Sequence, residues 1–214
     1  MPKAVDHEAR RRELAEAAWR VICAGGVHSA SVRAIAAEAG WSTGSLRHYF
    51  PTQDALLAFA MELLADKARA RLRALDDPDT RTLLRKIAEA LLPITAEQRV
   101  EAEAWLALLA WAQIDAGLRR AECDNREALL ARLSGVLRRA AANGELPESR
   151  NPDLEAVRLL ALIDGITLAC VFSPQRVSGD DALAAIDRQL EDLLQPQRLW
   201  PLQRPEGKRD SVAP

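Results

Sequence analysis

Apolar residues recur at steps of three and four along most of this 214-residue chain, and turn-forming residues interrupt them at short intervals. This spacing puts the apolar side chains on one face of a helix, so it predicts helices rather than strands. Gly, Pro, Asp and Asn stand between the apolar segments, which span about residues 14–25, 32–39, 42–49, 53–75, 80–92, 96–115, 118–142, 152–172 and 180–194. We therefore expect an all-α protein of about nine helices.

The composition agrees with a helical protein that folds without covalent staples. Hydrophobic residues make up 49% of the chain and aromatic residues only 4%, while Ala, Leu, Arg and Glu dominate. These side chains lose little rotamer freedom in a helix. The three cysteines, Cys23, Cys123 and Cys170, lie far apart, so we expect neither a disulfide framework nor a thiolate metal site, and we predict no metal and no cofactor.

The sequence shows no pattern typical of a signal peptide or of a membrane-spanning helix. The chain begins Met-Pro-Lys and reaches Arg10-Arg11-Arg12 without an apolar stretch, so we expect no signal peptide. The most apolar run, residues 156–172, contains Arg158 and Asp164 and is short for a membrane span. These features predict a cytoplasmic protein that makes no membrane contact.

The most specific motif lies in residues 31–50. Its fixed positions are Ser31, Ile35, Ala36, Ala39, Gly40, Trp41, Ser42, Gly44, Leu46, Tyr49 and Phe50. This pattern resembles the DNA-binding signature of the TetR family of bacterial regulators. The resemblance implies a helix-turn-helix in which Gly40 allows a sharp turn, while Leu46 and Phe50 bury one side of the third helix. The other side would face the major groove of double-stranded operator DNA.

The resemblance assigns DNA contacts to the start of the second helix and to the third helix: Ser31, Arg33, Ser42, Thr43, Gly44, Ser45, Arg47, His48 and Tyr49. Ser31 and Ser42 stand at helix N-termini, where hydroxyl and free N–H groups suit phosphate oxygens. Gly44 lets the helix backbone approach DNA closely. The first 50 residues carry a net charge of +2 and the remainder −4, which fits a phosphate-facing end but would not establish one.

Two residues depart from the family pattern. Arg47 stands where a tyrosine is common, and Gln53 stands where a lysine usually supports a phosphate contact. A guanidinium at Arg47 can pair with a phosphate or read guanine, so it can compensate for Gln53.

The sequence beyond Asp76 resembles the C-terminal domains of the BetI-like branch of the same family. The resemblance implies a helical bundle that binds an effector and forms a homodimer through the last two helices. A stripe on the final helix, Leu183, Ile186, Leu190 and Leu193, fits such an interface and fits an intramolecular core equally well. We expect a DNA-binding domain over residues 1–52, a linking helix 53–75, a C-terminal domain 76–195 and a flexible tail 196–214.

The same resemblance places an effector pocket for an unidentified small molecule among the middle helices, with Trp105, Leu108, Trp111, Gln113 and Asp164 as candidate lining residues. Asp164 lies in an otherwise apolar helix, where a carboxylate needs a donor or a cation. Arg158, a helix end and a cationic effector are all possible partners.

An enzyme is not expected, because all three histidines lie in the first 50 residues and no phosphate loop or nucleophile elbow occurs. The sequence is therefore interpreted as a ligand-responsive transcriptional repressor that binds a palindromic operator as a dimer. The alternative is a helical protein–protein adaptor that has lost DNA binding.

Overall fold

A computed structural model describes residues 6–194, so the predicted tail at 196–214 lies outside the described residues. Within this range the chain forms nine α-helices, a 3-10 turn at Val27–Ser29 and no strand. The helices are α1 (His7–Gly25), α2 (Val32–Glu38), α3 (Thr43–Tyr49), α4 (Gln53–Arg73), α5 (Thr80–Leu91), α6 (Ala96–Trp111), α7 (Ala116–Ala142), α8 (Pro152–Phe172) and α9 (Gly179–Leu194). The predicted fold class is confirmed.

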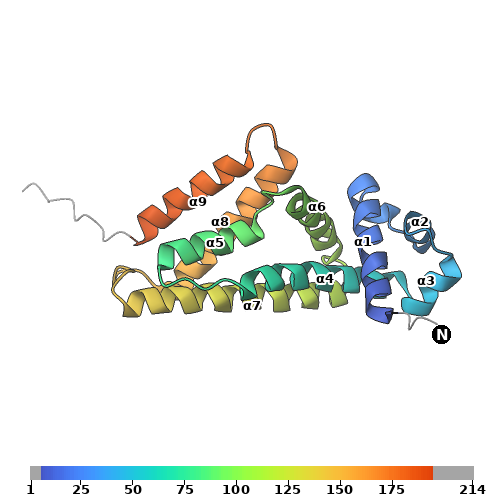
Figure 1. Cartoon of the computed structure of the whole chain (residues 1–214), viewed down its shortest axis with the longest axis horizontal. Coiled ribbons are helices and arrows are strands. Elements are labelled where there is room, and N and C mark those ends of the chain that lie inside the picture. Colours follow the sequence, from blue (N-terminus) through green and yellow to red (C-terminus); the bar gives the residue numbers. More distant parts are fainter. Residues whose placement is uncertain (1–5, 195–214) are drawn as a thin grey trace, which may run out of the picture.

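Helices α1, α2 and α3 form a small unit at one end of the molecule (Figure 1). Its core contains Leu14, Ile35 and Leu46, one from each helix, and all three are fully buried. The turn between α2 and α3 depends on Gly40, whose φ of 72° suits a residue without a Cβ atom. The amide of Trp41 then donates to the carbonyl of Ala36 at 2.8 Å, which closes the end of α2.

Helix α4 leads from this unit into the body and runs beside α7, the longest helix (Figure 1). The N-terminal half of α4 packs on α1, where the indole Nε1 of Trp19 donates to the carbonyl of Ala60 at 3.2 Å. Buried residues of α1 to α3, of α4 as far as Leu64 and of α6 at Leu108 belong to one hydrophobic cluster. The unit formed by α1, α2 and α3 is therefore packed continuously onto α4 and α6.

The body has a second hydrophobic cluster, formed by the C-terminal end of α4 with α5, α7, α8 and α9. The stripe on α9 belongs to this cluster: Ile186, Leu190 and Leu193 are fully buried and Leu183 is partly buried against it. Of the two interpretations of this stripe, the structure thus favours an intramolecular core. None of the helices within residues 6–194 is long and apolar enough to cross a membrane.

One junction differs from the expected helix boundaries. Helix α6 ends at Trp111 and α7 begins at Ala116, instead of spanning 96–115 and 118–142. Asp115 caps α7 by accepting a hydrogen bond from the amide of Leu118 at 2.7 Å, which fixes an earlier start. The 3-10 turn at Val27–Ser29 was also not expected.

Candidate functional site

The α2–α3 pair presents two capped helix N-termini on its outer face. The hydroxyl oxygen of Ser31 accepts from the amide of Ala34 at 3.2 Å, and that of Ser42 accepts from the amide of Ser45 at 3.0 Å. Both serines are exposed. They therefore mark the start of each helix, where an incoming phosphate could meet further free N–H groups.

The outward side of α3 is polar and open. Thr43, Gly44, Ser45, Arg47 and His48 are all exposed, whereas Leu46 is fully buried. A Cβ atom added at Gly44 would meet only the Ser42 hydroxyl, at 3.8 Å, so the fold itself does not require a glycine there. The residues of α3 that the resemblance assigns to DNA are thus exposed to solvent, apart from the half-buried Tyr49.

Arg33 and Arg47 are exposed on this face, and neither forms an ion pair with any residue in the range 6–194. Tyr49 is half-buried and its ring contacts those of His7 and Trp41, with centroids 4.6 and 5.4 Å apart. Its ring therefore also packs the end of α3 against the start of α1.

Arg10 brings a further cation to the same face. Its guanidinium lies 5.4 Å from the centre of the Trp41 ring and pairs with Glu13 at 2.8 Å. The hydrogen bond from Arg10, together with one from the Trp41 indole at 3.3 Å, lowers the pKa of Glu13 despite partial desolvation. Arg10, Glu13 and Trp41 thus fix the first turns of α1 beside α3.

A cavity of about 140 Å³ lies in the body among α4, α6, α7 and α8. Most of its wall is apolar, with Met61, Leu129, Leu160 and Ile163 among the lining residues. Five ionisable side chains also reach it: Arg71, Glu101, Glu122, Arg126 and Asp164. An apolar cavity with a few converging polar groups is typical of a small-molecule site.

In the cavity wall, Trp105 and Asp164 each have a partner on α7. The indole Nε1 of Trp105 donates to Glu122 Oε2 at 3.2 Å, and Arg126 Nη2 donates to Asp164 Oδ2 at 2.8 Å. Arg126 is much closer to Asp164 than to Glu122, from which it stands at 3.9 Å. Burial raises the pKa of Glu122, and the Asp164 charge adds to this, while the Trp105 hydrogen bond and Arg126 oppose it.

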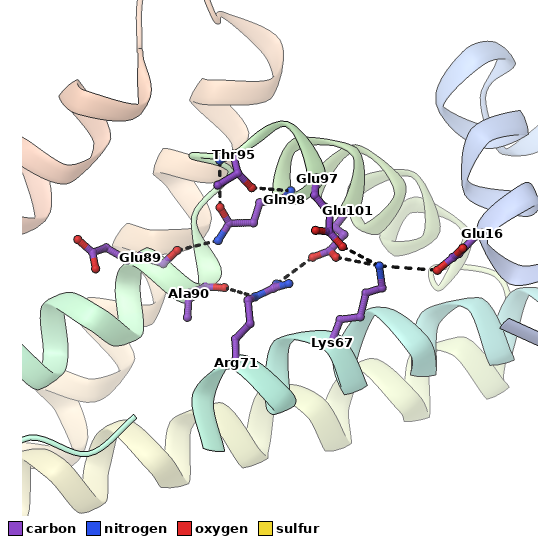
Figure 2. A network of polar contacts seen from close by, with 9 residues as sticks. All are labelled: Glu16, Lys67, Arg71, Glu89, Ala90, Thr95, Glu97, Gln98 and Glu101. Carbon is purple, nitrogen blue, oxygen red and sulfur yellow. Dashed lines mark hydrogen bonds and ion pairs between the residues drawn. The ribbon is translucent and has the colours of Figure 1, made fainter. Parts of the chain in front are cut away.

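Glu101 of α6, which also lines the cavity, is 7% exposed and faces two cations of α4. Its Oε2 lies 2.8 Å from Arg71 Nη2, and its Oε1 lies 3.5 Å from Lys67 Nζ. Figure 2 shows Glu101 between these two side chains, with Glu16 of α1 on the far side of Lys67. The cavity wall is thus linked by ion pairs to the DNA-binding end.

Two of the five predicted pocket residues, Trp105 and Asp164, line the cavity. The other three lie elsewhere: Leu108 is fully buried in the N-terminal cluster, Trp111 contacts the His28 ring with centroids 5.9 Å apart, and Gln113 is exposed in the turn after α6. A residue step of six on α6 turns Trp111 away from the cavity face that Trp105 occupies.

The partner of Asp164 is Arg126, and not Arg158, which pairs with Glu155 at 3.0 Å. Sequence reasoning missed Glu101, Glu122 and Arg126. The last two stand four residues apart on α7, a spacing that in a sequence is typical of a solvated surface pair. Within residues 6–194, no group of three His, Cys, Asp or Glu side chains could hold a metal ion.

An N-terminal helix-turn-helix unit joined by a long helix to a helical body with an internal cavity defines a ligand-responsive DNA-binding regulator. Residues 14–60 match the bacterial regulatory proteins of the tetR family, and residues 78–195 match the C-terminal domain of BetI-type transcriptional repressors. The chain belongs to the TetR family of transcriptional regulators.

Relatives and solved structures agree over nearly the whole length. The chain is 39% identical to the HTH-type transcriptional regulator PksA of Bacillus subtilis, over 90% of this chain and 94% of that protein. It is 32% identical to the regulator BetI of Vibrio parahaemolyticus, over 91% and 96%.

Among solved structures, a transcriptional regulator from Rhodococcus superposes with a TM-score of 0.78 at 31% identity, covering 86% of this chain and 96% of that one. A regulator from Saccharomonospora viridis, solved in complex with choline, has a TM-score of 0.77 at 25% identity, covering 88% and 99%. All four of these proteins are transcriptional regulators.

Proposed function

We propose that this TetR-family regulator represses transcription as a homodimer that binds a palindromic operator and releases it when a small molecule enters the body. The observation that carries the proposal is the outer face of α2 and α3. There two capped helix N-termini and the side chains of Arg33 and Arg47 are exposed, and neither arginine forms an ion pair within residues 6–194. Since its target is chromosomal DNA, the protein would act in the bacterial cytoplasm.

A dimer is supported by an apolar stripe on the outer face of α8. Its members are exposed and follow one another at steps of three or four: Leu154, Val157, Ala161, Gly165, Leu168 and Phe172. Phe172 is 71% exposed, which is unusual for so large an apolar side chain. A second copy of the chain would cover this stripe through a two-fold axis and set two α3 helices about 34–36 Å apart, in successive major grooves.

The effector proposed for the cavity is a small organic cation. Three carboxylates and two guanidinium groups line the wall, so one negative charge stays unmatched when all are ionised. Trp105 lies beside the carboxylate of Glu122, and an indole ring attracts cations such as quaternary ammonium groups. Choline in the Saccharomonospora viridis regulator is a ligand of this class.

Helix α4 would carry the response, because it packs on α1 and also supplies Met61 and Arg71 to the cavity wall. Ligand binding need only favour one tilt of α4 over another to change the distance between the two recognition helices. The effect is a population shift, whose size is limited by the difference in ligand affinity between the two states.

The DNA-binding proposal is tested by selecting duplexes from a random library with the purified protein. Binding is then measured by fluorescence anisotropy over a series of salt concentrations. We expect a palindromic consensus and an affinity that falls steeply as salt rises, because bound phosphates release counterions. Absence of salt-sensitive binding at low ionic strength would contradict the proposal and favour the protein–protein adaptor.

The effector class is tested by calorimetry with choline and with a neutral alcohol of the same shape. We expect choline to bind at least about tenfold more tightly, a difference of about 1.4 kcal/mol. Equal affinities would exclude a cation site.

A further inference from the structure

Lys67 of α4 lies at the junction of three helices. Its Nζ is 2.9 Å from Glu97 Oε1 and 3.5 Å from Glu101 Oε1, both on α6, and 3.8 Å from Glu16 Oε1 on α1. The ammonium also lies 5.3 Å from the centre of the Trp19 ring of α1. One side chain of the linking helix thus holds α1 and α6 together (Figure 2).

The charge of Lys67 is secured by this environment. Partial burial alone would lower its pKa, but the hydrogen bond to Glu97 and the charges of Glu101, Glu97 and Glu16 outweigh that effect and raise the pKa. The ammonium therefore remains charged at neutral pH and holds all three contacts.

The three carboxylates around Lys67 differ in burial. The side chains of Glu97 and Glu16 are 71% and 44% exposed, whereas that of Glu101 is 8% exposed. Ion pairs in water contribute little to stability, but removing a partner from a buried charge is costly. The contact between Lys67 and Glu101 is therefore the one that matters most for the placement of these helices.

Glu101 is also the member of this network that reaches the cavity. It lines the wall beside Arg71, and its Oε1 is buried without a hydrogen bond from any residue in the range 6–194. Arg71 in turn donates to the carbonyl of Ala90 at 2.9 Å, at the end of α5. A cation that enters the cavity and approaches Glu101 would compete with Lys67 and Arg71 for the charge of this carboxylate.

We propose that Glu101 is the positioning residue that transmits occupancy of the cavity to the DNA-binding end through Lys67. In the empty protein Glu101 holds Lys67, and Lys67 holds α1 against α6. A cationic ligand draws the carboxylate away, the contact between α1 and α6 loosens, and operator affinity falls. This inference rests on the proposed function, since it requires both a cationic effector and DNA binding at the α2–α3 face.

The test compares Glu101→Gln with Glu97→Gln, which removes a carboxylate from the same helix and the same lysine but lies outside the cavity wall. In the absence of any ligand, Glu101→Gln should lower the affinity for the selected duplex at least about fivefold and speed amide exchange in α1. Glu97→Gln should change neither. Choline, used as the probe, should weaken DNA binding by the wild type and should have less effect on Glu101→Gln.

A second variant, Lys67→Met, removes the charge but keeps an unbranched side chain of similar length, and it serves if Glu101→Gln fails to fold. It should reproduce the loss of DNA affinity, and the double variant should be no weaker than Lys67→Met alone, because both act on one contact. Equal behaviour of Glu101→Gln and Glu97→Gln, or additive losses in the double variant, would overturn the inference. If the wild type selects no duplex, the proposed function fails, and α1 exchange still decides whether Glu101 controls α1.

Discussion

Gly44 and Arg47 are two residues of α3 that contribute little to the packing of the folded chain. Both are exposed, Gly44 has room for a methyl group and Arg47 has no ion pair within the part of the chain described. Residues whose side chains make no packing contact or ion pair can be changed without loss of stability. They are therefore the best positions at which to separate DNA binding from folding.

Replacing Gly44 by Ala should raise stability by about 0.5–1 kcal/mol, because alanine loses less conformational entropy in a helix. The same methyl group should keep the α3 backbone from approaching a phosphate and weaken operator binding about tenfold, or 1.4 kcal/mol. Thermal unfolding and fluorescence anisotropy measure the two effects. Gly135→Ala on α7 is the matched control, since that exposed glycine also has open space around it and lies outside the DNA-binding unit. It should stabilise the protein without any loss of affinity.

Reversing the charge of Arg47 to Glu should weaken operator binding by about tenfold or more and lower the salt slope by about one, as expected when a contact to DNA is lost. The dimer should persist, as measured by sedimentation. The same reversal at Arg120, an exposed arginine of α7, serves as the control. An unchanged affinity of the Arg47→Glu variant would remove this residue from the interface.

Glu122 should make stability depend on pH in the opposite sense to an ordinary paired carboxylate. Its pKa in the folded protein is raised above the usual 4.5, so the folded state binds more protons than the unfolded state between these two pKa values. Stability contributed by the protonated group is therefore lost as pH rises through this window. Glu122→Gln should raise the melting temperature at about pH 7 and have less effect near pH 4. The reverse order would show that Glu122 is stabilised as an anion.

At the scale of the elements, apolar spacing and capping residues predicted the positions of nearly all the helices. Ser31 and Ser42 are the N-caps that the sequence indicated, and Gly40 takes the conformation expected of it. The stripe on α9 shows where this reasoning stops, because an apolar face is identical in sequence whether its partner is another helix of the same chain or of a second chain. Only the packing of α5 against α9 decides between them.

The exposed apolar stripe on α8 predicts which helix forms the dimer interface. Leu168→Glu should produce a monomer, because it puts a charge in the middle of the proposed two-fold interface. Sedimentation equilibrium measures the change. Ile114→Glu is the control, since Ile114 is 74% exposed but lies in the turn after α6. A Leu168→Glu variant that stays dimeric would place the interface elsewhere.

At the scale of the whole molecule, the cavity could be predicted only in part. Trp105 and Asp164 stood out because a large aromatic ring and a lone carboxylate are rare in apolar helices. Glu101, Glu122 and Arg126 could not be identified in this way, because charged residues in a helical sequence are normally interpreted as surface residues. Only the packing of four helices from distant parts of the sequence brings them to the cavity. Leu108 and Trp111 show the converse, because their apolar character serves the cluster next to the DNA-binding end.

The continuous cluster that joins α1 to α4 and α6 limits how such regulators can be recombined. A fragment that contains only α1, α2 and α3 and ends at residue 52 would lack Leu56, Phe59 and Leu108, which belong to the same hydrophobic cluster in the whole chain. A chimera meant to combine this operator specificity with a foreign sensor should therefore carry α4 as far as Leu64. The foreign sensor domain should also provide an apolar surface like that of α6, on which α1 packs. Without this surface, the transferred N-terminal helices would expose apolar residues that are buried in the native protein.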